Sequence, residues 1–149
     1  MPLKLLLLSL FLIFSCDNST ESSCEKDACG VCNGNGSTCE VDGQKDIYYQ
    51  TSTPISGFEF IIVGVDVIDA IGGAAETAGF TVSTNSTTGV VLGFSFSGAT
   101  IPAGEGVLVT LNFSGSGNAC IIENSLVVSD INAQSLSSFV VDCYSIKID

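Results

Sequence analysis

From residue 44 to residue 149, apolar and polar residues alternate over short runs, and this pattern constrains the fold more than any other feature of the chain. The clearest run is residues 107–113, where two sets of side chains alternate. One set is Val107, Val109, Leu111 and Phe113, and the other is Leu108, Thr110 and Asn112. A period of two is typical of a strand with one buried face. The run therefore predicts a half-buried strand with the first set on one face.

Eight such runs of β-branched and aromatic residues, separated by Gly, Ser, Thr and Asn, predict the strands of this segment. They cover residues 47–51, 57–63, 65–68, 80–84, 90–96, 107–113, 121–128 and 139–148. Residues 70–79 are rich in Ala and Gly and predict a single helical turn or a loop. About 105 residues suffice for one sandwich and are too few for two. We therefore expect residues 44–149 to form an all-β domain, a single antiparallel β-sandwich.

The N-terminal residues 1–15 predict a signal peptide. A lysine near the start precedes an apolar run at residues 5–14, which spans only about 15 Å as a helix, half of a hydrocarbon core. The run ends in Ile13-Phe14-Ser15-Cys16, which resembles the lipobox of bacterial lipoproteins. The resemblance implies that Cys16 is lipidated and anchors the exported chain to a membrane, facing the periplasm or the cell exterior. The alternative is an ordinary signal peptide with a cysteine nearby.

The seven cysteines divide into three groups along the chain. Apart from Cys16, six remain, an even number that suits disulfides in an oxidising compartment. Four of them, Cys24, Cys29, Cys32 and Cys39, follow a C-x4-C-x2-C-x6-C spacing, and the last two are Cys120 and Cys143. We expect a polar tether at residues 16–23, a disulfide-rich spacer at residues 24–43 with its connectivity open, and a disulfide within the sandwich.

Metal chemistry is the alternative for the four-cysteine cluster. Its C-x4-C-x2-C spacing occurs in plant-type iron–sulfur proteins, but such a protein would need a twin-arginine signal, and the chain contains no arginine. A zinc ribbon needs two C-x2-C knuckles, and only the pair Cys29 and Cys32 provides one. Disulfides remain the preferred interpretation.

Two segments resemble known families. Residues 27–39, DACGVCNGNGSTC, resemble the CGVCxGxxSTC element of exported microbial proteins and the end of the cysteine-rich module in secreted metalloproteases with thrombospondin motifs. Residues 48–141 resemble cohesin-like β-sandwich domains, which share a superfamily with carbohydrate-binding modules. That resemblance is carried by ISGFEF at 55–60, GGAAETAGF at 72–80, VLGFSFSGATIPAG at 91–104, GVLVTLNF at 106–113 and VSD at 128–130. It implies a protein partner, dockerin-like or other, or else a polysaccharide.

The composition excludes several functions. Without histidine the chain cannot hold a Ser-His-Asp triad, and four basic residues against 16 acidic ones, a net charge of −12, disfavour nucleic acid as a partner. Catalysis would depend on carboxylates. Asp66 and Asp69 are the nearest pair in the β-domain, and we favour their role as solvated residues near a turn. Glu59 is expected to be exposed on its strand, facing away from Phe58 and Phe60.

Weak ligand candidates remain. Tyr48 and Tyr49 are adjacent aromatic residues of the kind that bind sugars, but neighbouring strand residues face opposite ways, so they form one platform only on a bulged strand. Asp130 and Asn132, and likewise Asn33 and Asn35, offer oxygen atoms to calcium, with turn formation as the alternative. We expect no cofactor, with calcium as the alternative. The sequence thus predicts a non-enzymatic, lipid-anchored module for protein binding or adhesion, with polysaccharide binding as the alternative.

Overall fold

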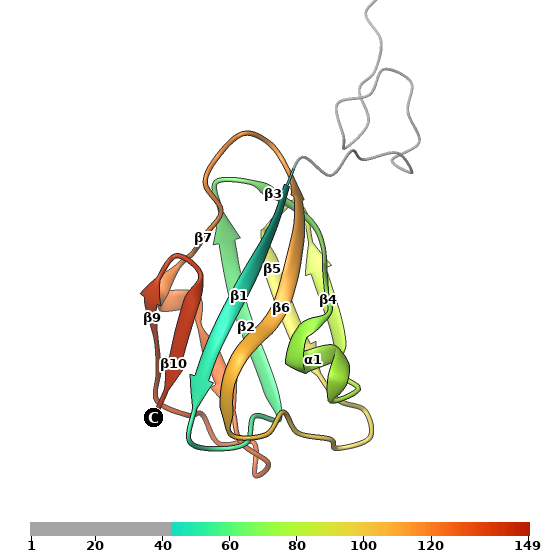
Figure 1. Cartoon of the computed structure of the whole chain (residues 1–149), viewed down its shortest axis with the longest axis vertical. Coiled ribbons are helices and arrows are strands. Elements are labelled where there is room, and N and C mark those ends of the chain that lie inside the picture. Colours follow the sequence, from blue (N-terminus) through green and yellow to red (C-terminus); the bar gives the residue numbers. More distant parts are fainter. Residues whose placement is uncertain (1–42) are drawn as a thin grey trace, which may run out of the picture.

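The hydrophobic residues of the alternating runs meet between two β-sheets, as the strand periodicity predicts. The structure, a computed structural model, describes residues 43–149. One sheet, here called the β1 sheet, has the order β3-β6-β1-β10-β9 (Figure 1). Its strands are β1 (Gly43–Thr51), β3 (Asp66–Ile71), β6 (Gly104–Ser114), β9 (Ser138–Asp142) and β10 (Ser145–Ile148). The fold class predicted from the sequence, an all-β sandwich, is confirmed.

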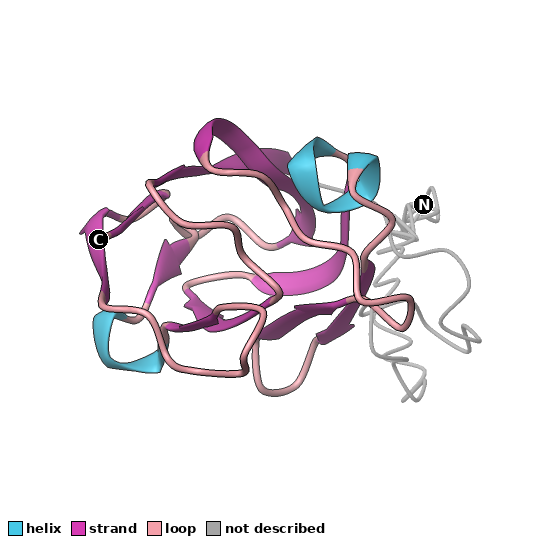
Figure 2. Ribbon diagram, turned by 90° about the horizontal axis from the view of Figure 1, so that it is seen from below, coloured by secondary structure: helices cyan, strands magenta, loops and turns pink. Residues whose placement is uncertain are grey.

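The second layer, here called the β2 sheet, is built around one central strand. β5 pairs with one edge of β2, while β7 and β8 pair with the other, and β4 completes the sheet beside β5. These strands are β2 (Gly57–Val63), β4 (Thr81–Asn85), β5 (Val90–Phe94), β7 (Cys120–Ile121) and β8 (Val127–Ser129). The view from below shows the two layers of strands with loops joining them at this end (Figure 2).

The core lies between the sheets and is mostly aliphatic and aromatic. Alternate residues of β2, Phe58, Phe60 and Ile62, are buried together with Ile47 of β1. The rings of Phe58 and Phe60 lie parallel, with centroids 6.0 Å apart, and Phe80 stacks on Phe58 at 6.2 Å. Full burial of such side chains stabilises a fold by about 1.5–3 kcal/mol each. The burial of these side chains explains why every second residue of the alternating runs is apolar.

A β-bulge interrupts the alternation expected along residues 107–113. Ile47 pairs with Val109 and Tyr48 pairs with Val107, so Leu108 is an extra residue on β6. Leu108 and Val109 are both buried, and Val107 is only half-buried. The expected strict alternation is therefore wrong at Val107 and at Leu108, because an inserted residue reverses the faces of the strand beyond it.

Two segments predicted as single strands are each divided. Residues 121–128 form β7, the 3₁₀ turn η1 (Glu123–Ser125) and β8. Residues 139–148 form the hairpin of β9 and β10, whose turn is closed by a hydrogen bond from the Tyr144 N–H to the Asp142 carboxylate at 2.9 Å.

The Ala- and Gly-rich segment contains one short helix, α1 (Gly73–Thr77). Among the strand pairs of residues 43–149, the pairing of β1 with β10 is parallel and the others are antiparallel.

The expected disulfide between Cys120 and Cys143 is present. Cys120 belongs to β7 of the β2 sheet, and Cys143 lies in the turn between β9 and β10 of the β1 sheet, so the bond joins the two layers. Beside it, the Ile121 N–H donates to the Cys143 carbonyl at 3.1 Å.

The predictions for the N-terminal part fall outside the described residues. These are the signal peptide, the lipidation of Cys16, the tether and the disulfides of Cys24, Cys29, Cys32 and Cys39. Within residues 43–149, no helix has the length and apolar character needed to cross a bilayer.

Candidate functional site

The outer surface of the β2 sheet carries apolar residues where a half-buried strand would carry polar ones. Because Phe58, Phe60 and Ile62 point inward, the alternate residues of β2 point outward, and the same holds for β5, where Val91 and Gly93 are buried. The outward residues form what we call the apolar face. Its members are Ile61, Val63, Val90, Leu92, Phe94 and Val127.

Cross-strand pairing brings these side chains together. Gly57 pairs with Phe94, Glu59 with Leu92, and Ile61 with Val90. On the other edge of β2, Val127 is opposite Glu59. A shallow groove runs across this part of the sheet, and it is lined by Gly57, Glu59, Leu92, Phe94, Val127 and Ser129, among others. Directly opposed side chains contact one another, so the face is continuous over at least three strands.

The apolar face is accessible to a partner in part, since two of its six residues are exposed and four are half-buried. Val63 is 45% exposed and Val127 is 51% exposed. Just beyond β5, Phe96 is 87% exposed, and its ring contacts Phe94 edge to face at a centroid distance of 4.8 Å. Contiguous exposed apolar surface of this kind marks interaction sites, whereas single exposed apolar residues do not.

Glu59 is the single charged residue among the strand residues of the β2 sheet that point outward. It is exposed, as its position between Phe58 and Phe60 predicts. Within residues 43–149 its carboxylate makes no hydrogen bond or ion pair. The expected side-chain direction is confirmed, and Glu59 is available to a cationic group on a partner.

Sequence reasoning missed the apolar face, although a signal was present. The segments GFEFIIV and VVLGF carry apolar residues at both odd and even positions, with Glu59 as the single charged exception. A strand that is solvated on one face alternates, while a strand that is covered on both faces reads as a continuous apolar run. Two neighbouring continuous runs on one sheet therefore indicate a second surface that becomes covered.

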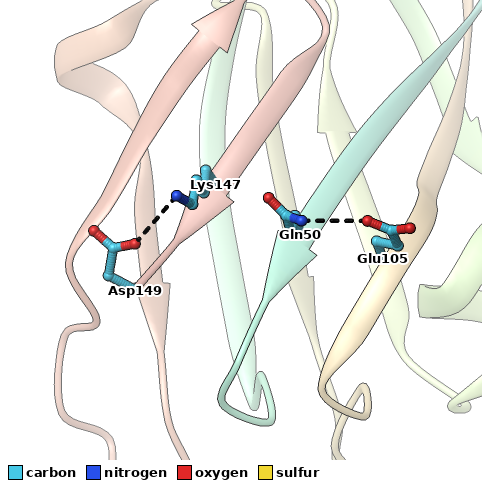
Figure 3. Close-up of polar contacts among 4 residues, drawn as sticks. All are labelled: Gln50, Glu105, Lys147 and Asp149. Carbon is cyan, nitrogen blue, oxygen red and sulfur yellow. Dashed lines mark hydrogen bonds and ion pairs between the residues drawn. The ribbon is translucent and has the colours of Figure 1, made fainter.

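The strands of the β1 sheet expose polar side chains together with the apolar or aromatic residues Tyr48, Ile71, Phe139 and Val141. A groove, here called the Tyr48 groove, has a volume of about 530 Å³ and is lined chiefly by Tyr48, Gln50, Glu105, Val141, Ser145 and Lys147. The Gln50 side-chain amide donates to the Glu105 carboxylate at 3.2 Å, and the Lys147 ammonium lies 3.8 Å from the Asp149 carboxylate (Figure 3).

The two tyrosine candidates are separated by the sheet. Tyr48 points outward and is 46% exposed, whereas Tyr49 points inward and is 8% exposed. The bulge next to them lies on β6, so β1 keeps its alternation. Only Tyr48 therefore offers an open ring surface to a ligand.

The carboxylates considered for catalysis lie at the far end of this sheet. Asp69 accepts a hydrogen bond from the Asn112 amide, and Asn112 in turn accepts one from Gln44 at 2.7 Å. Asp66 lies opposite Ser114, at the start of β3. The Thr110 hydroxyl donates to Asp46 at 2.7 Å. Asp69 thus takes part in a side-chain network that links β3, β6 and β1.

The calcium candidates Asp130 and Asn132 lie in the loop after β8. One carboxylate oxygen of Asp130 accepts the N–H groups of Asn132 and Gln134, each at 2.8 Å. The N–H of Gln134, followed by the contacts with Asn132, holds the pKa of Asp130 below its usual value, although desolvation opposes this. In the part of the chain that the structure describes, no three acidic, cysteine or histidine side chains gather as a metal site. Turn formation accounts for the Asp130 loop, and calcium binding stays a prediction.

Comparison with known proteins gives one informative similarity. No protein-family model and no curated protein matches the chain. Among solved structures, the chain is similar to one from a crystallised cohesin–dockerin complex, with a TM-score of 0.52 and 17% identity, over 71% of this chain and 87% of that chain. An identity this low bears on the fold alone. The described domain therefore has a cohesin-like β-sandwich fold.

Proposed function

We propose that this chain is a non-enzymatic interaction module that binds a protein partner of the dockerin type through the apolar face. The observation that carries the proposal is the row of outward apolar residues on β2, β5 and β8, in which Val63 and Val127 are exposed and the others, such as Phe94, are half-buried. Their burial against a partner would be favourable at about 25 cal/mol per Å² of apolar surface. The similar fold of a chain from a cohesin–dockerin complex supports the type of partner.

The chemistry of the partner follows from Glu59. This carboxylate lies within an otherwise uncharged face, and a bare charge is costly to bury without an opposite charge or hydrogen-bond donors. A partner that covers Glu59 should therefore present apolar side chains around a lysine or an arginine. The net charge of −12 would also favour the approach of a basic surface.

The proposal includes export, lipid anchoring and the absence of catalysis. Support for export and anchoring comes from the apolar run before Cys16 and from the lipobox resemblance, which together favour a chain that faces the periplasm or cell exterior. The lack of histidine and the structural hydrogen bond of Asp69 support a non-catalytic role. The mass of the mature N-terminus tests the anchor, and an unmodified Cys16 would contradict it.

Three matched valine substitutions test the docking face. Val63→Asp and Val127→Asp place a charge on the apolar face, and Val141→Asp places one on the β1 sheet, at a valine that is also exposed. Binding to a panel of dockerin domains, measured by biolayer interferometry, should be lost in the first two variants and kept in the third. Melting temperatures close to that of the original chain verify that each variant is folded. Failure of all dockerin domains to bind, or binding that survives both Val63→Asp and Val127→Asp, would overturn the proposal.

Polysaccharide binding is the second candidate function. The observation that favours it is the exposed ring of Tyr48 beside the polar side chains of Gln50, Glu105 and Lys147, on the sheet opposite the apolar face.

A further inference from the structure

Three polar side chains lie side by side across the Tyr48 groove. Gln50 of β1 is directly opposite Lys147 of β10 on one side and Glu105 of β6 on the other. Figure 3 shows the three on neighbouring strands, with the Gln50 amide directed toward Glu105. Since adjacent strands are about 4.8 Å apart, the backbones of Lys147 and Glu105 are separated by about 10 Å. The groove thus presents a row of hydrogen-bonding groups about as wide as a small ring-shaped ligand with its substituents.

Apolar side chains lie beside this row of three polar side chains. Tyr48 precedes Gln50 by two residues on the same face of β1, which is a distance of about 7 Å along the strand. Opposite Tyr48 on β10 is Ser145, and the exposed side chain of Val141 lines the same groove. A ligand in the groove would therefore meet a phenol ring and a valine on one side, and polar groups at its edge.

The hydrogen-bonding capacity of the row is only partly used. The Gln50 amide nitrogen donates to one oxygen of Glu105, and the Lys147 ammonium approaches one oxygen of Asp149. Each of these groups has further capacity, because a carboxylate accepts several hydrogen bonds, an amide both donates and accepts, and an ammonium has three donors. Ligands with neighbouring hydroxyl groups suit such a row, since each hydroxyl both donates and accepts.

The charged side chains around the groove favour uncharged ligands over anionic ones. The positive charge of Lys147 is opposed by Asp149 at 3.8 Å, and Glu105 adds a negative charge to the same groove. The chain as a whole carries −12. Phosphorylated or uronic-acid ligands would meet net repulsion, so the groove favours uncharged ones.

We propose that the Tyr48 groove binds neutral pyranose units of a polysaccharide, with a sugar ring stacked on Tyr48 and its hydroxyl groups bonded to Gln50, Glu105 and Lys147. The groove volume of about 530 Å³ lies in the range of about 300–1,000 Å³ that is usual for small-ligand sites. The inference deepens the second candidate function by giving its site and ligand class, and it does not depend on the apolar face. Because the groove and the apolar face belong to opposite sheets, a sugar and a protein partner can be bound together.

Isothermal titration calorimetry of the full chain tests the inference. The probes are cellohexaose, mannohexaose, maltohexaose and laminarihexaose, with hexagalacturonate as the anionic counterpart. At least one neutral probe should bind with a dissociation constant in the millimolar range or below, and hexagalacturonate should bind more weakly. Tyr48→Ala and Gln50→Ala should each weaken binding about tenfold, the amount expected from the loss of a ring contact or of hydrogen bonds. Tyr48→Phe, which keeps the ring, should retain most of the affinity.

The control variant is Val127→Asp, which alters the opposite sheet and should leave sugar affinity unchanged. If no neutral probe binds, if Tyr48→Ala binds as well as the original chain, or if hexagalacturonate binds most tightly, the inference is overturned. Dockerin binding measured on the same variants separates the two functions, since Tyr48→Ala should not affect it and Val127→Asp should abolish it.

Discussion

The aromatic ring of Phe58 fills the space in which residue 93 would place a side chain. A Cβ atom built on Gly93 would lie 2.2 Å from the Phe58 ring, a distance at which atoms cannot coexist. The two residues are also cross-strand partners, Phe58 on β2 and Gly93 on β5. The glycine is therefore required by packing and not by a turn, and it holds Phe58 in the core beneath the apolar face.

Gly93→Ala should destabilise the domain by about 1–3 kcal/mol, the range seen when an extra methyl group is forced into a packed core. Urea denaturation gives the change in unfolding free energy. In a chain that already carries Phe58→Leu, Gly93→Ala should lower the unfolding free energy by less than it does in the original chain. The smaller side chain of Leu makes room for the added methyl group. Additive effects of the two substitutions would contradict the proposed contact.

Leu108→Ala should cost about 2–5 kcal/mol, as for other buried leucines, since Leu108 is fully buried at the bulge. The neighbouring Val107→Ala should cost clearly less, because Val107 is only half-buried. Equilibrium unfolding of both variants measures the difference. A larger loss of unfolding free energy in Val107→Ala than in Leu108→Ala would mean that the strict alternation expected from the sequence is right and that there is no bulge at Leu108.

Removing the disulfide with Cys120→Ser and Cys143→Ser together should lower the unfolding free energy by about 3 kcal/mol, the chain-entropy value for a loop closed by residues 23 apart. Thermal unfolding followed by circular dichroism compares this double variant with the original chain. An unchanged melting temperature would show that the bond adds nothing to the link between the two sheets.

Stability should fall in acid through Asp130 and Asp142. The N–H of Gln134 lowers the pKa of Asp130, and the N–H of Tyr144 lowers the pKa of Asp142, both from 3.8. A carboxyl group with a lowered pKa in the folded state stabilises the fold above its unfolded pKa and loses this contribution as pH falls through the folded pKa. The denaturation midpoint should therefore fall when the pH is lowered below about 4. This fall should be smaller in Asp142→Asn and in Asp130→Asn than in the original chain. Variants that match the original pH profile would contradict these assignments.

The parts of the fold that depend on local pattern could be predicted, and those that depend on distant partners could not. The β2 strand was predicted with the bounds that the structure gives, because its inward residues alternate without interruption. The division of residues 121–128 depends on the Ser125 hydroxyl, which accepts the N–H of Ile61 at 2.9 Å from a position 64 residues away. The bulge at Leu108 likewise arises only when β6 is aligned with β1.

The candidate site likewise combines residues that the local sequence pattern could identify with residues that only strand pairing brings together. Tyr48 could be singled out as an aromatic residue next to another, and the strand period predicts that it and Tyr49 face opposite ways, but only the structure shows that Tyr48 is the outward one. Its neighbours in the groove, Glu105 and Lys147, are 57 and 99 residues away in the chain and meet Gln50 only through strand pairing. The apolar face is carried by residues that local reasoning assigns to the core, because strand periodicity does not distinguish a surface buried by folding from one buried by a partner.

The parallel pairing of β1 with β10 predicts how the domain would respond to mechanical force. The two strands are adjacent over the register from Tyr48 with Ser145 to Thr51 with Ile148. β1 enters the domain at the upper end in Figure 1, and the C-terminus leaves at the lower end. Tension applied at residue 43 and residue 149 would pull these neighbouring strands in opposite directions along their own axes. All the hydrogen bonds between them would then bear load at once and would have to break together, which is the geometry that resists extension, whereas peeling a hairpin breaks its bonds one at a time.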